Sequence, residues 1–174
     1  HGAPIAAALD YLTSAVADVA SVSERRHARL VDSAVSGLPA FLSTDPGLNS
    51  GFMMVQVSAA ALVSECKTLA HPASVDSIPT SAGQEDHVSM GSIAARNAMT
   101  VLEHSERIVG IELICASQGL DLRLDLQPHT APGVGVAEAH ARVRSVIERL
   151  EEDREPGPDI EAAFGLVHDG ALVE

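Results

Sequence analysis

An uninterrupted helical pattern over residues 82–118 constrains the fold of this 174-residue chain more than any other feature. A helix of that length would be ~55 Å long at ~1.5 Å per residue. A compact domain of this chain length has a radius of gyration near ~16 Å and a diameter of about 40 Å. The helix is too long for a compact monomer. Its apolar stretch IVGIELICA (108–116) must be shielded from water by other helices. We therefore predict an all-α bundle of long helices that forms part of a larger helical homo-oligomer.

The rest of the sequence predicts further helices and no convincing strand. Long helices are expected at 4–31 and 52–70, and shorter ones at 136–152 and 158–168. In the first helix, apolar side chains recur in steps of four and three and share one face: Ile5, Leu9, Leu12, Val16 and Val19. The second is nearly apolar all round, which predicts that it is buried.

Composition narrows the class of partner. The net charge is -13, only 2% of the residues are aromatic, and there is no Trp. An acidic chain repels phosphate backbones and anionic membrane surfaces, and it has few aromatic rings on which bases could stack. No apolar run reaches the ~18 residues that span a bilayer, and no signal-peptide pattern is present. We predict neither a nucleic-acid nor a membrane partner.

Two cysteines, Cys66 and Cys115, lie in apolar helical runs and do not form a disulfide framework. We interpret them as reduced, buried thiols, which places the protein in the cytoplasm. The first residue is His rather than Met, so we expect either that a segment has been removed upstream or that the chain is a piece of a longer one.

Several tempting motifs carry little weight. GVG at 133–135 lacks the preceding strand and the third glycine of a dinucleotide-binding loop. Five residues could be imagined as metal ligands: His71, Asp76, Glu85, Asp86 and His87. Their spacing matches no strong metal motif, so we predict no metal site.

Glu112 is a lone carboxylate in the most apolar part of the long helix. A buried carboxylate needs a partner or a shifted pKa. We expect it to pair with an arginine of another helix, such as Arg26 or Arg96, and a catalytic role is the alternative.

TSAGQEDHVSMG, residues 80–91, combines a helix-start pattern with two adjacent carboxylates. Ser81 and Gln84 have capping-box spacing, which would place Glu85 in the first helical turn and on a shared face with them. One interpretation of the two carboxylates is a solvated helix cap, because acidic residues are common in first helical turns. The other is a functional site. The preceding loop with two prolines, HPASVDSIPT, favours a built site, because such loops often position functional groups.

Several long segments of the chain resemble a known protein family. The segment GLNSGFMMVQVSAAALVSECKTLAHPASVDSIPTSAGQEDHVSMGSIAAR is similar to the aromatic amino acid ammonia-lyases, and most of all to their histidine-specific members. SERRHARLVD, SGLPAFL, IELICASQGLDLR and PDIEAAFGLVHDGALVE extend the resemblance over essentially the whole chain. Only 124–155 is weakly matched.

The resemblance implies a homotetramer of long helices whose active sites each draw on three subunits. It implies non-oxidative deamination of L-histidine to urocanate and ammonia, on the electrophile methylidene-imidazolone (MIO) formed from an internal Ala-Ser-Gly. Glu85 matches the glutamate that faces the substrate in histidine-specific members, so it is the expected catalytic and substrate-binding residue. Gln84 is the expected neighbour lining the pocket, and Ser81 is expected to cap the helix.

The resemblance covers only the C-terminal third of the family. No Ala-Ser-Gly occurs in the chain, so we expect the cofactor and the remaining catalytic residues to lie in the N-terminal part of the same enzyme. The isolated chain is then expected to be inactive. Cys66 and Gly83 stand where relatives often have Asn. Two alternatives remain: a lyase or aminomutase acting on another aromatic amino acid, and a non-catalytic helical oligomerisation module.

Overall fold

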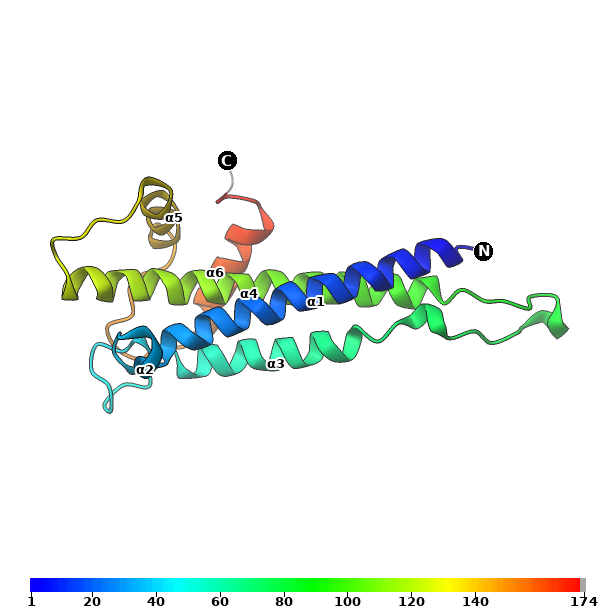
Figure 1. The fold of residues 1–174 in the computed structure, drawn as a ribbon, viewed down its shortest axis with the longest axis horizontal. Coiled ribbons are helices and arrows are strands. Elements are labelled where there is room, and N and C mark those ends of the chain that lie inside the picture. The colour runs from blue at the N-terminus through cyan, green and yellow to red at the C-terminus, as the bar shows by residue number, and fades with distance from the viewer. Residues whose placement is uncertain (173–174) are drawn as a thin grey trace. The chain divides into compact units, whose positions relative to one another are not determined.

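The computed structural model describes residues 1–172, which form helices, turns and loops but no strand. The helices are α1 (Ala3–Val31), α2 (Ser33–Ser36), α3 (Met53–Leu69), α4 (Gly91–Leu126), α5 (Val134–Arg144) and α6 (Gly157–His168) (Figure 1). Three 3₁₀ turns accompany them: η1 (Ala40–Leu42), η2 (Ala73–Val75) and η3 (Ser81–Gly83). The predicted all-α class is confirmed.

The chain forms two compact units, each built from two stretches of sequence. The first unit comprises His1–Ser21 and Leu62–Ser105, and the second comprises Val22–Ala61 and the residues from Glu106 onward. The first contains the long loop between α3 and α4, and the second contains the larger hydrophobic core.

In the first unit, α1 buries a face of small side chains. The buried residues recur in steps of four and three: Ala6, Asp10, Thr13, Ala17 and Ala20. The larger apolar face is exposed, with 67% of Ile5, 52% of Leu12 and 61% of Val19 accessible. Small side chains allow two helix backbones to approach closely, whereas a face of large apolar side chains left open marks a surface for another partner. The predicted apolar face exists, but Ile5, Leu12 and Val19 on it stay exposed among the described residues.

Helix α1 is also long and apolar enough to cross a membrane by length and composition, although no uninterrupted apolar run does so. A single helix of this kind is weak support for a membrane span, because buried core helices share these properties. The α1 face that is buried carries a carboxylate at Asp10, which is costly in a hydrocarbon environment.

In the second unit, the core is formed by apolar residues of α3, α4, α5 and the segments around them. It includes Leu42, Phe52, Val55, Ile111, Ile114, Val143 and Ile147. Gly110 of α4 lets α6 approach closely, because a Cβ there would lie 3.1 Å from the backbone of Ala163. The predicted burial of α3 is only partly correct, since one side of it exposes 56% of Met54 and 48% of Val57.

The bounds of three predicted helices agree closely with the structure, and those of two others are wrong. Helices α1, α3 and α6 match the predictions to within about one residue at each end. The expected 82–118 helix is observed at Gly91–Leu126. Helix α4 continues past Gly119, which packs against Leu38: the Leu38 Cδ1 atom would lie 3.3 Å from a Cβ at this position. The helix ends shortly before Pro128, which cannot continue it.

The expected 136–152 helix is observed only at Val134–Arg144. The residues after Arg144 leave the helix axis. The backbone N–H and C=O of Leu150 form hydrogen bonds with the side chain of Gln118 rather than with a helical partner.

Both cysteines are confirmed as free and buried, and burial raises the pKa of Cys115 to about 12.

Candidate functional site

The loop between α3 and α4 runs outward and returns as a hairpin (Figure 1). Two cross-links join its limbs. Near its tip, Thr80 and Glu85 form an isolated antiparallel bridge: the Thr80 N–H donates to the Glu85 carbonyl at 3.0 Å, and the Glu85 N–H returns a bond at 3.3 Å. Nearer its base, the Val88 N–H donates to the Ser77 hydroxyl at 3.0 Å. These bonds fix the two limbs of the loop in register.

The tip of the hairpin is held in a left-handed backbone conformation. Ser81, Ala82 and Gly83 have φ of 54°, 56° and 88°. Positive φ is sterically unfavourable for residues with a Cβ, so Ser81 and Ala82 are strained. The turn keeps this strained conformation because the bridge between its flanking residues, Thr80 and Glu85, closes it.

This geometry corrects the predicted helix start. Ser81 is not an N-cap and Glu85 is not in a first helical turn, because α4 begins at Gly91. The capping-box spacing of Ser81 and Gln84 is satisfied by another structure, in which the Gln84 N–H donates to the Ser81 carbonyl at 3.1 Å. A capped helix therefore does not explain the carboxylates in this segment.

Glu85 is the half-exposed carboxylate of the hairpin. Its side chain is 43% exposed, and its Oε2 atom lies 3.2 Å from the Nδ1 atom of His1. Gln84, next to it, is exposed and makes no side-chain hydrogen bond among the described residues. Asp86 and His87 are exposed as well. The loop thus presents one carboxylate that already contacts an imidazole nitrogen.

In the described part of the chain, no group of three or more His, Cys, Asp or Glu side chains is placed to hold an ion. His71, Asp76, Glu85, Asp86 and His87 are spread along the limbs and tip of the hairpin.

Glu112 belongs to the second unit and is paired as expected. Arg26 donates to it from Nε at 2.5 Å and from Nη2 at 2.7 Å, and the Ser23 hydroxyl donates at 2.6 Å. Burial alone would raise the pKa of Glu112, but the hydrogen bonds from Arg26 and Ser23 and the arginine charge outweigh it and leave the pKa below its ordinary value. Glu112 is an ionised structural partner, and Arg96 is not involved.

Replacing Glu112 with Gln is expected to lower the free energy of unfolding at neutral pH by about 2 kcal/mol, since the arginine loses its charge-assisted bonds. Because the pKa of Glu112 is lower in the folded state, its contribution is fully present above its ordinary value of 4.5 and is lost as pH falls through the folded value. Urea unfolding at neutral and acid pH measures both effects. The difference between wild type and variant should shrink on acidification.

The matched control is Glu161→Gln. Glu161 pairs with Arg107 at 3.2 Å, but its side chain is 61% exposed, so the pair should contribute less than ~1 kcal/mol. Equal losses in the two variants would contradict the structural role of the Glu112 pair.

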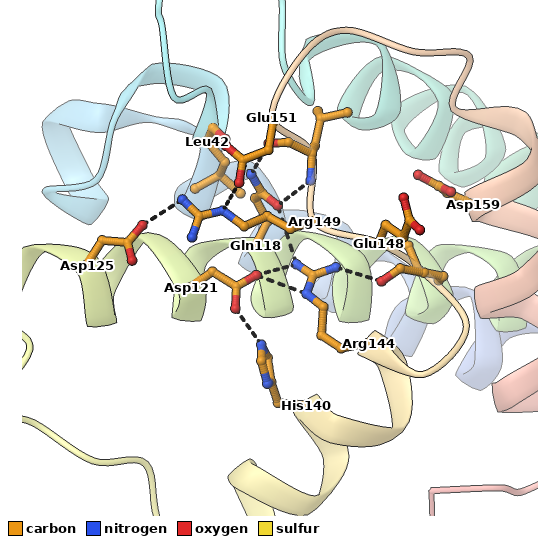
Figure 2. Close-up of polar contacts among 12 residues, drawn as sticks. Leu42, Gln118, Asp121, Asp125, His140, Arg144, Glu148, Arg149, Glu151 and Asp159 are labelled. Atoms are coloured by element: carbon orange, nitrogen blue, oxygen red, sulfur yellow. Dashed lines mark hydrogen bonds and ion pairs between the residues drawn. The ribbon is translucent and has the colours of Figure 1, made fainter.

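Sequence reasoning missed a buried polar network in the second unit, shown in Figure 2. The Gln118 amide nitrogen donates to the carbonyls of Leu42 at 3.2 Å and Leu150 at 2.8 Å, and its oxygen accepts the Leu150 N–H at 3.1 Å. One turn further along α4, Asp121 accepts from His140 and Arg144, each at 2.7 Å in its closest approach. The network joins α4, α5 and two loops, and every polar atom of Gln118 has a partner from another segment, so we assign it to stability.

The described residues form long helices and no strand, and a strained loop presents the Glu85 carboxylate, so the protein is all-α and its candidate site lies on a loop. A family model described as aromatic amino acid lyase matches residues 1–145. The chain belongs to the aromatic amino acid lyase family.

Relatives and solved structures agree on the family. The chain is 53% identical to a histidine ammonia-lyase of Natranaerobius thermophilus, covering 99% of this chain and 34% of the relative. It is 55% identical to one of Anaeromyxobacter sp. strain K, covering 99% and 33%. It superimposes on the crystal structure of histidine ammonia-lyase from Trypanosoma cruzi with a TM-score of 0.94 at 49% identity, covering 99% and 33%.

A tyrosine aminomutase from Streptomyces globisporus has the same fold, with a TM-score of 0.92 at 36% identity, covering 99% of this chain and 32% of that one. The chain therefore spans about a third of the length of the relatives that it matches.

Proposed function

We propose that the chain is the C-terminal third of a histidine ammonia-lyase-type enzyme, which converts L-histidine to urocanate and ammonia. The observation that carries the proposal is 53% identity to a histidine ammonia-lyase over 174 residues, a span that includes the hairpin and Glu85. In this assignment the chain supplies Glu85 and much of the helical scaffold, and the N-terminal part of the protein supplies the rest of the site.

Glu85 is the proposed substrate-recognition and catalytic residue. A carboxylate accepts an imidazole N–H and favours the charged ring, which an amide does less well. The Glu85 side chain is 43% exposed, which leaves its carboxylate accessible to a substrate. Gln84 is adjacent in sequence and exposed, and we propose it as a neighbouring pocket residue.

The proposed cofactor, MIO, would supply the electrophile for the substrate amine. It forms from Ala-Ser-Gly, and the 174 residues contain no such triplet. None of the 174 residues can form the group, so we assign it to the N-terminal part of the protein.

We further propose a cytoplasmic homotetramer that binds neither nucleic acid nor membrane. The exposed apolar face of α1, formed by Ile5, Leu12 and Val19, supports association with further copies or with the N-terminal part. Two free, buried cysteines support a reducing compartment. The net charge of -13 supports the absence of an anionic partner.

The test is product analysis with the whole protein and L-histidine, L-tyrosine or L-phenylalanine. We expect urocanate and ammonia in equal amounts from histidine, and little product from the other two. A β-amino acid without net ammonia would instead identify an aminomutase, the reaction named for the Streptomyces globisporus neighbour. No turnover of any of the three would leave the helical scaffold as the function.

A further inference from the structure

Asp10 is an unusual residue for the face of α1 on which it lies. Its neighbours on that face are Ala6, Thr13 and Ala17, and only 5% of Asp10 is exposed. A carboxylate buried among small residues is costly unless hydrogen bonds compensate for the loss of water. The groups that hydrogen-bond the buried Asp10 carboxylate therefore indicate its role.

The partner of Asp10 is the entry to the hairpin that carries Glu85. The Ser74 N–H donates to the Asp10 carboxylate at 2.7 Å. Burial alone would raise the pKa of Asp10, but hydrogen bonds from Ser74 and from the Ala73 backbone, with the charge of His71, outweigh it and keep the carboxylate ionised.

The 3₁₀ turn η2 depends on this distant cap. Its own N-cap residue is Pro72, which provides no side-chain hydrogen bond. Asp10 therefore satisfies the amides at the start of η2 from another element, as a cap residue ordinarily would from within the turn.

The ties along the hairpin extend this constraint towards Glu85. Beyond η2, the Ser77–Val88 bond joins the two limbs, and the Thr80–Glu85 bridge closes the tip. Two prolines, Pro72 and Pro79, further restrict the entering limb. The returning limb reaches α4 at Gly91, where a Cβ would lie 3.7 Å from that of Ala6. Helix α1 thus holds both limbs at their base.

We propose that Asp10 is a positioning residue for Glu85: by capping η2 from α1, it sets the place of the hairpin that presents the substrate-facing carboxylate. The proposal rests on the function proposed above. Asp10 is buried and bonds the entry of the hairpin rather than Glu85 itself, so we expect its effect on turnover to act through Glu85.

A double-mutant cycle in the whole protein tests this coupling. Asp10→Ala should lower kcat/KM for histidine by about tenfold to a hundredfold, since small misplacements of a recognising group have effects of that size. Asp10→Asn keeps the shape and one acceptor oxygen, so it should lower kcat/KM less than Asp10→Ala does. This variant replaces Asp10→Ala in the cycle if the alanine variant does not assemble. In a Glu85→Gln background, either change at Asp10 should cost less than about twofold.

Asp18→Ala is the matched control, because Asp18 is an exposed carboxylate on the same helix with no hydrogen bond in the described structure. It should leave kcat/KM within about twofold in both backgrounds. Losses at Asp10 that multiply with the loss at Glu85 would overturn the positioning role, as would a wild-type rate in Asp10→Ala. If wild type itself fails to turn over histidine, the proposed function fails instead, so the two failures are distinguishable.

Discussion

Replacing Glu85 with Gln in the whole protein should lower kcat/KM for histidine by roughly a hundredfold, the largest loss expected from a single residue of this chain. In its proposed role the carboxylate accepts an imidazole N–H of the substrate, and such a charge-assisted bond contributes roughly 1.5–3 kcal/mol. Glutamine has nearly the same shape, so the hairpin should be preserved while the charge is removed. Steady-state kinetics of urocanate formation, with histidine varied, measures the change.

Asp86→Asn is the natural comparison, because Asp86 is the next residue, is exposed and belongs to the same hairpin. It should remain within about twofold of wild type. An unchanged rate in Glu85→Gln would assign the chain a scaffolding role only. A loss of equal size at Asp86 would show that the local negative charge matters rather than the Glu85 carboxylate itself.

Helix type and the Glu112 partner were predictable because both depend on strong local patterns. Periodic apolar residues identify α1, and a lone carboxylate in IVGIELICA demands a cation. The structure supplies Arg26 at 2.5 Å, one of the two arginines expected. A buried carboxylate requires a cationic partner, so the sequence limits the candidates to arginines on neighbouring helices.

The start of α4 was not predictable from the same kind of reasoning. TSAGQE matches a capping box, but Ser81 and Ala82 adopt positive φ and the segment closes as a turn. Neither residue favours that conformation on its own. The turn is stabilised by the Thr80–Glu85 bridge and by anchoring of the hairpin base to α1, and the anchoring depends on a distant contact that the local sequence does not encode.

The packing direction of α1 shows a different limit. Two faces of the helix repeat with the same period, and the sequence favours burial of the one with larger side chains, including Ile5 and Leu12. The structure buries Ala6 and Ala17 instead, because close packing within this chain requires small residues. Amphipathicity identifies the apolar surface, but it does not identify which molecule covers it.

Gln118 and Asp10 were missed for a related reason. Both make their main hydrogen bonds to backbone groups of distant segments: Leu42 and Leu150 for Gln118, and Ser74 for Asp10. Backbone partners carry no side-chain signature, so a polar residue on a helix is easily taken for a solvated one. The observation that distinguishes them is burial, since Gln118 is fully buried and Asp10 nearly so.

The 174-residue chain, purified alone, is expected to form no urocanate from histidine at any concentration, whereas the whole protein should do so. The reason is chemical rather than conformational: the chain contains Glu85 but no Ala-Ser-Gly, so the proposed MIO electrophile cannot form in it. A helical circular-dichroism spectrum of the isolated chain would separate this cause from simple unfolding. Co-expression with the N-terminal part should restore activity, and restoration should be about a hundredfold weaker when the chain carries Glu85→Gln. Urocanate formed by the isolated chain would contradict both the division of the active site and the source of its electrophile.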